Sequence, residues 1–259
     1  AQERNTGANA LEEAAFIQAG EMTLGADLRI SEDFTIGFAM TNIRNGAPLA
    51  GLQPRQDDTS LSGAVYAALQ SGQSFTDMYF GFARQNMAVE RASMGDFAFA
   101  YDSARAATDG DQMFGGMRVG YAFGILPGVE AGPVASVDYV RNDLNGYSEF
   151  GAGQFGLTVL DRTFTSVGSK AGLMASLDTG IGQRSRLSAF GSVAYARELA
   201  DTEDIVTATF SGASDLPFSI VNQLDPDWVS MTAGIDFAFG SRFSVSLRGQ
   251  SDLGRGVLT

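Results

Sequence analysis

Cysteine and histidine are both absent from the 259 residues of this chain. Without histidine, the chain cannot assemble a Ser-His-Asp or Cys-His catalytic group, nor a zinc site with histidine ligands. The absence of cysteine agrees with a compartment in which free thiols are oxidised. These absences remove most nucleophilic and zinc chemistry and leave paired carboxylates, a lysine or tyrosine base, or a calcium site.

Long apolar runs are also missing. No segment approaches the roughly 18–20 apolar residues of a membrane-spanning helix, and the mean hydropathy is close to zero. The chain is glycine-rich, with 32 glycines, which argues against a helical domain. Its 30 acidic residues outnumber its 17 basic ones, and the net charge of −13 argues against a nucleic-acid partner, because phosphates need a basic surface.

The chain does contain a repeated alternation of apolar and polar residues. From 243 to 253 the odd positions include Phe243, Val245 and Leu247, whereas the even positions are polar. Successive strand residues face opposite sides, so this pattern predicts a strand with one apolar face. The alternation recurs in segments 22–30, 34–44, 58–69, 75–88, 113–123, 129–139, 167–177, 187–195 and 229–239. About ten strands result, each long enough for a tilted membrane crossing.

The polarity of the two faces distinguishes a membrane barrel from a soluble all-β domain. A soluble sandwich or barrel exposes a charge-rich face, but here the polar face is mostly Gly, Ser, Ala and Thr, with about one charge per strand. This face predicts a wet lumen, and its candidate pore-lining residues are Asp27, Arg29, Arg118, Asp138, Lys170, Asp236 and Arg248. An equally simple interpretation is that these charges pair and stiffen the wall. The apolar face carries aromatics near strand ends, as in an interfacial girdle: Phe34, Phe75, Phe123, Tyr139, Tyr195, Phe239 and Phe243.

The connections between these strands alternate in length. Short ones fall at 31–33, 70–74, 124–128, 179–183 and 240–241, and long polar ones near 45–57, 89–111, 145–156 and 201–226. Such alternation predicts tight turns on the periplasmic side and long loops facing the cell exterior. Segments 101–111 and 201–226 are predicted to be polar, mobile loops.

The two ends of the strand pattern are incomplete. Segment 22–30 runs into a short turn and so descends, whereas 243–253 follows a short turn and so ascends. Bacterial barrels close with an even strand number, so we expect one strand before residue 22 and a closing strand after 254, giving about twelve strands. We expect residues 1–21 to be a lead-in that forms either a pore helix or the first strand. We expect residues 22–259 to form the barrel, without its C-terminal closing strand.

The order of these features resembles the autotransporter C-terminal β-barrel translocator family of type V secretion. The resemblance covers nearly the whole chain, from the opening hairpin 24–29 and 34–39, through 145–149, 155–159, 169–173 and 195–199, to the late segments 207–213 and 218–220. It departs at the final strand, where the family has a terminal Phe or Tyr, and at the first strand, which is usually rich in aromatics. The fold class is thus expected to be all-β, an antiparallel up-and-down transmembrane β-barrel.

The resemblance implies an outer-membrane protein of a Gram-negative bacterium that anchors and exports an N-terminal passenger domain of the same polypeptide. It also implies outer-membrane lipid, lipopolysaccharide and the barrel assembly machinery as partners. The alternative is a passenger-less porin or small structural barrel, which a signal peptide immediately upstream would favour. We expect no enzyme activity, cofactor or metal in this chain. A loop carboxylate cluster that could bind a cation or bridge to lipopolysaccharide is more simply explained as solvated charge: Asp109, Asp111, Asp201, Glu203 and Asp204.

Overall fold

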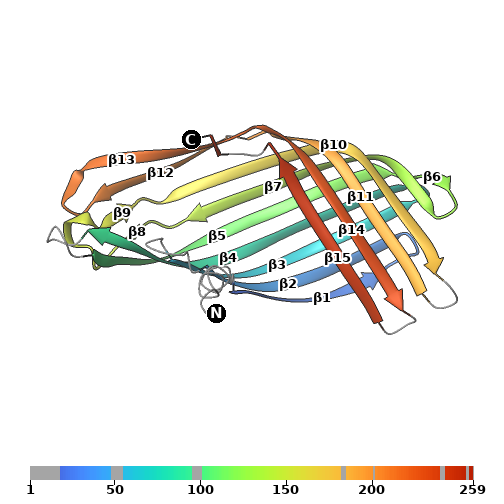
Figure 1. The fold of residues 1–259 in the computed structure, drawn as a ribbon, viewed down its shortest axis with the longest axis horizontal. Helices are drawn as coiled ribbons and strands as arrows, with labels where there is room; N and C mark the ends of the chain where they lie inside the picture. The colour runs from blue at the N-terminus through green and yellow to red at the C-terminus, as the bar shows by residue number, and fades with distance from the viewer. Residues whose placement is uncertain are drawn as a thin grey trace, which may run out of the picture.

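A computed structural model describes residues 18–47, 55–94, 101–181, 185–200, 202–239, 243–254 and 257–258. Within them, the main sheet has eleven antiparallel strands, ten of which follow chain order without a crossover. The sheet curls into an open barrel (Figure 1). Its strands are β1 (Gln18–Arg29), β2 (Phe34–Ala47), β3 (Arg55–Ser71), β4 (Ser74–Met94), β5 (Tyr101–Tyr121), β6 (Phe123–Leu126), β7 (Val129–Leu144), β10 (Arg162–Ile181), β11 (Ser185–Glu198), β14 (Asp227–Phe239) and β15 (Phe243–Leu253).

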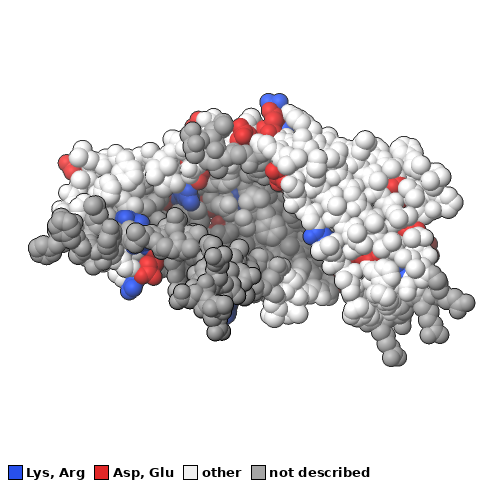
Figure 2. Space-filling model, in the orientation of Figure 1, with Lys and Arg blue, Asp and Glu red and all other residues white. Residues whose placement is uncertain are grey.

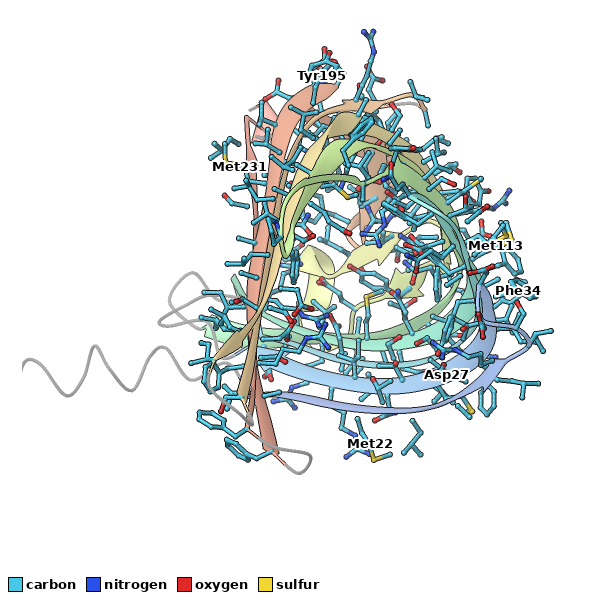
Figure 3. All side chains as sticks on the ribbon, turned by 90° about the vertical axis from the view of Figure 1, so that its right-hand side faces the viewer. Met22, Asp27, Phe34, Met113, Tyr195 and Met231 are labelled. Atoms are coloured by element: carbon cyan, nitrogen blue, oxygen red, sulfur yellow. The ribbon has the colours of Figure 1, made fainter. Side chains whose placement is uncertain are left out.

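The alternation in the sequence becomes two distinct faces of this sheet. Because the ten strands in chain order pair without a register shift, apolar residues of neighbouring strands fall on the same side, as Ile235 of β14 does opposite Leu247 of β15. These side chains point outward: Leu24 is 65% exposed, Val65 59% and Leu247 73%. Figure 3 shows Met22, Met113, Tyr195 and Met231 on the outside of the ring and Asp27 on its inside.

Few residues of the described chain are buried, and most of those are small. Ala104 and Ala196 are fully buried, and Trp228 is the largest buried hydrophobic residue, with 4% of its surface exposed. The large apolar side chains instead form the outer surface. A continuous apolar exterior around a polar interior is the arrangement of a transmembrane barrel, whose outer face is covered by lipid.

A second sheet lies at the long-loop end of the barrel. It contains β8 (Tyr147–Ser148), β9 (Leu157–Val159), β12 (Glu203–Phe210), β13 (Ala213–Leu224) and β16 (Val257–Leu258), with the 3₁₀ helix η2 (Gly153–Phe155) between β8 and β9. A bridge between Arg105 of β5 and Phe150 joins it to the main sheet. Strands β8, β9, β12 and β13 lie at the left in Figure 1, opposite the short turns at the right.

The structure corrects two loop predictions. Segment 101–111 belongs to β5 and pairs with residues 84–94 of β4, and most of 201–226 forms the β12–β13 hairpin. Both segments are polar, but ladder hydrogen bonds to a partner strand satisfy their backbones, and hydropathy does not report such pairing. β1 starts at Gln18, so residues 18–21 of the predicted lead-in are part of the sheet; residues 1–17 lie outside the described residues.

None of the described segments is a helix of the length and apolarity needed to span a membrane.

Candidate functional site

The inner face of the sheet encloses a cavity of about 850 Å³. Its lining comes from β4, β5, β7, β10, β11, β14 and β15. The space-filling view shows this hollow with acidic and basic side chains at its wall (Figure 2). Strand alternation places these side chains inward, because each occupies the face opposite the apolar one.

Five of the seven predicted pore-lining residues line this cavity: Arg118, Asp138, Lys170, Asp236 and Arg248. The other two, Asp27 and Arg29, lie on the inner face of β1, outside the cavity lining. Asp27 accepts a hydrogen bond from the Tyr66 hydroxyl, which comes from β3 across the intervening strand β2. The cavity also contains charged residues that sequence analysis did not single out, Asp77 and Glu130.

Arginines of the cavity are held against the wall by carboxylates and aromatic rings. Arg118 binds Asp77, with its Nη2 2.5 Å and its Nε 3.0 Å from Oδ2, and its guanidinium lies 5.3 Å from the centre of the Phe75 ring. Arg248 repeats the arrangement, with Asp236 at 3.7 Å and the Phe190 ring centre at 5.7 Å. The prediction that Phe75 belongs to the outer girdle is therefore wrong. Alternation in 75–88 was noisy there, and the cation–π contact is visible only in three dimensions.

A second arrangement crosses three strands. Tyr79 of β4, Gly116 of β5 and Asp138 of β7 lie in one row of the sheet. The Tyr79 hydroxyl donates a hydrogen bond to Asp138 Oδ1 over a distance of 2.8 Å, passing over the glycine. Tyr66, Gly37 and Asp27 form an equivalent row in β3, β2 and β1. Glycine is required because a Cβ at Gly116 would lie 2.7 Å from the Tyr79 ring.

The charges of the cavity nearly balance. Four acidic residues, Asp77, Glu130, Asp138 and Asp236, accompany three basic ones, Arg118, Lys170 and Arg248. Lys170 of β10 stands beside Ser136 and Ala196 in the register and forms no ion pair with any described residue. A wall with both signs interspersed is well solvated but presents no strong field of one sign.

The loop carboxylates within the described residues do not gather into a cation site. Asp109 Oδ2 lies 2.7 Å from Arg84 Nη2, and Asp204 Oδ2 lies 2.7 Å from Arg162 Nη1. No group of three acidic residues suited to a metal ion occurs in the part of the chain that the structure describes. Asp201 lies outside the described residues.

An ion pair with a buried carboxylate fastens the second sheet to β4. Arg91 donates hydrogen bonds to both carboxylate oxygens of Glu149, at 2.8 and 2.6 Å, and another to the Phe155 carbonyl oxygen at 2.9 Å. Glu149, whose side chain is only 3% exposed, also accepts one from the Leu157 amide at 2.8 Å. Burial, followed by the charge of Glu149, raises the pKa of the nearby Tyr147 hydroxyl.

Comparison with known proteins agrees with this architecture. The sequence matches the family model of the Autotransporter beta-domain over residues 3–250. The structure is similar to the translocator domain of autotransporter NalP from Neisseria meningitidis, with a TM-score of 0.60 and 16% sequence identity, over 93% of this chain and 80% of that one. No curated protein sequence matches the chain.

Proposed function

Because this chain belongs to the autotransporter β-domain family, and is therefore an outer-membrane barrel that exports a passenger domain, we propose that the passenger's polypeptide crosses through the cavity of the inner face. The single observation that supports this route is the cavity itself, whose wall carries four acidic and three basic residues. An unfolded polypeptide carries backbone dipoles and side chains of both signs. A mixed, hydrated wall solvates such a chain without holding it.

The positions of these charges also support a route that stays open. Asp77 and Phe75 hold Arg118 against the wall, and Asp236 and Phe190 hold Arg248. Tyr79 lies over Gly116 rather than across the cavity. Side chains that lie along the wall leave the middle of the lumen to water and to the passing chain. The pairing of charges and the lining of a pore are therefore compatible roles for the same residues.

The orientation follows from the connections. The second sheet and the longer connections share one end of the barrel, and the short turns share the other. Longer connections of bacterial barrels face outside, so we place the second sheet at the cell exterior.

We further propose contacts with the barrel assembly machinery and lipopolysaccharide. We also propose that any enzyme activity lies in the passenger, since a chain without histidine or cysteine lacks the usual nucleophile–base pairs.

Photo-crosslinking in the full-length protein tests the route. A photoreactive amino acid at Ser136 or Thr232, which line the cavity, is compared with one at the adjacent outward positions Val137 and Met231. During export of a slowed passenger, we expect adducts to the passenger from Ser136 and Thr232 and none from Val137 and Met231. A passenger that reaches the surface without forming adducts at the inward positions would place the route elsewhere.

A further inference from the structure

Four arginines lie on the outer face of the barrel at one end of the apolar surface. They are Arg44 of β2, Arg84 of β4, Arg141 of β7 and Arg197 of β11, hereafter the rim arginines. Each belongs to a strand that runs toward the long-loop end. They lie ten, ten, twelve and twelve residues beyond the first residues of their strands, Phe34, Ser74, Val129 and Ser185. Every outward position between those first residues and the rim arginines is uncharged. The sequence repeats this spacing with Arg255, twelve residues after Phe243, although Arg255 is outside the described residues.

The strand register gives the offset along the strands between each rim arginine and the next. Through β3, Arg44 is level with Asn86, two residues above Arg84. Through β5, Arg84 is level with Asp143, two residues above Arg141. Through β10, Arg197 is level with Val137, four residues below Arg141.

These offsets match the tilt of a barrel strand. The rim arginines descend eight residues over six strand spacings. At about 3.3 Å per residue and 4.8 Å per spacing, the row of arginines slopes by about 42° from the direction perpendicular to the strands. This angle lies within the roughly 35–45° by which the strands of transmembrane barrels tilt from the barrel axis. The short turns descend around the barrel in the same direction. Phe34, the first residue of β2, pairs with Leu69 of β3, and β3 continues two residues further, to Ser71. The row is therefore a ring perpendicular to the barrel axis.

The height of this ring matches the edge of the membrane hydrocarbon. Ten to twelve residues of strand tilted by about 42° rise about 25–29 Å, close to the apolar band of about 25 Å in outer-membrane barrels. Guanidinium groups at this level reach the lipid headgroups while their stems stay against apolar surface.

The rim arginines keep free donors for a ligand. Arg84, Arg141 and Arg197 have side chains 65%, 47% and 58% exposed, and each faces an aspartate, at 2.7, 3.0 and 3.9 Å. Arg44 is exposed and forms no ion pair within the described residues. A guanidinium has five N–H donors, and one carboxylate engages at most two of them in a bidentate contact. The remaining donors match a phosphate group, which arginine binds in the same forked geometry.

We propose that the rim arginines bind the phosphates of a phosphorylated glycolipid, the lipid A part of lipopolysaccharide, around the outer circumference of the barrel. The proposal rests on the orientation proposed above, which places the ring in the outer leaflet. It also gives the barrel a fixed depth, since four phosphate contacts at one level resist vertical displacement.

Lipid binding by the full chain, purified folded in detergent, tests the proposal. Native mass spectrometry measures the dissociation constant for diphosphoryl lipid A, for its dephosphorylated form and for phosphatidylglycerol. Near an anionic surface one arginine contributes roughly fivefold in affinity. We expect R44Q to weaken diphosphoryl lipid A binding about fivefold and the fourfold variant R44Q/R84Q/R141Q/R197Q at least tenfold. Dephosphorylation should weaken binding to the unaltered protein but not to the fourfold variant.

The matched control is R118Q/R248Q, which removes two arginines from the inner face and should leave lipid binding unchanged. If the fourfold variant does not fold, R44Q still reports, because it breaks no ion pair with a described residue. Unchanged affinity in R44Q and the fourfold variant would overturn the proposal, and so would equal affinity of the unaltered protein for phosphatidylglycerol. Passenger crosslinking at Ser136 reports on the translocation route separately, so failure of one proposal does not imply failure of the other.

Discussion

Replacing Gly116 by alanine perturbs the most sharply defined contact of the inner face. A Cβ at this position would lie 2.7 Å from Tyr79 Cε1 and 2.7 Å from Asp138 Oδ1, whereas an ordinary contact begins near 3.4 Å. The Tyr79 ring must therefore move by about 0.7 Å or more. The 2.8 Å hydrogen bond from Tyr79 to Asp138 cannot survive such a shift without rearrangement of the row.

Two effects add in the G116A variant. Overpacking in a tight contact costs about 1–3 kcal/mol. Loss of a hydrogen bond to a charged group adds about 1.5 kcal/mol, the lower end of its range, because the pair is solvent-exposed. We expect the free energy of unfolding to fall by about 2.5–4.5 kcal/mol. The Y79F variant, which removes only the hydroxyl, should lose about 1.5 kcal/mol.

Guanidinium unfolding of the barrel in lipid vesicles provides the measurement. Trp228, the single tryptophan, is 4% exposed and serves as an intrinsic fluorescence probe. The control is Gly168→Ala, because Gly168 stands beside Asp138 on the next strand, and a Cβ added there would meet no atom within 4 Å. G168A should change stability by less than about 0.5 kcal/mol. If G116A is as stable as G168A at equal denaturant slope, the steric reasoning is refuted.

Two further predictions concern the outer surface and the second sheet. V65K places a charge in the apolar band and should lower the free energy of unfolding by about 2–4 kcal/mol. A64K, on the inner face, should lower it by less than half as much. Equal losses in vesicle unfolding would contradict the assignment of faces. E149Q leaves Arg91 without its carboxylate partner and should weaken the attachment of the second sheet by about 2 kcal/mol, the size of a hydrogen bond to a charged group, because the Arg91 side chain is 26% exposed. The expected sign is roughly thirtyfold faster amide hydrogen exchange in residues 146–160. Unchanged exchange there would show that the ion pair does not hold this segment.

Sequence alone predicted the features of the fold that depend on period and polarity. Alternation identified the ten segments that became strands of the main sheet and assigned inner and outer faces correctly at Asp138 and Leu247. Those assignments need only the two-residue period of a strand. Register adds information that no single segment contains. Asp77 lies opposite Arg118 because β4 and β5 pair without a break in register, and a register shift of one residue would separate them.

The missed features all depend on contacts between segments. Phe75 was predicted to be a girdle residue because it lies at a strand start, but its ring packs beside Arg118 on the inner face. Polar segment 101–111 reads as a loop, yet β4 continues beside it as far as Met94. Beyond residue 254, the described residues 257–258 form β16, which pairs with β13 of the second sheet. The helix or strand expected in residues 1–17 stays a prediction, because these residues lie outside the described part of the chain.

The glycine rows connect the stability of the wall with the width of the lumen. A tyrosine that projected freely from β4 would cross the cavity, but Gly116 leaves space on the neighbouring strand, and Asp138 two strands away holds the hydroxyl. Tyr66, Gly37 and Asp27 form the same arrangement on the inner face of β3, β2 and β1, at the edge of the sheet. Each row thus fixes three strands together with one side chain and keeps that side chain against the wall. Because a Cβ on the glycine displaces the ring inward, a substitution that weakens the wall also narrows the path, so stability and export should decline together in G116A and in its Gly37 counterpart.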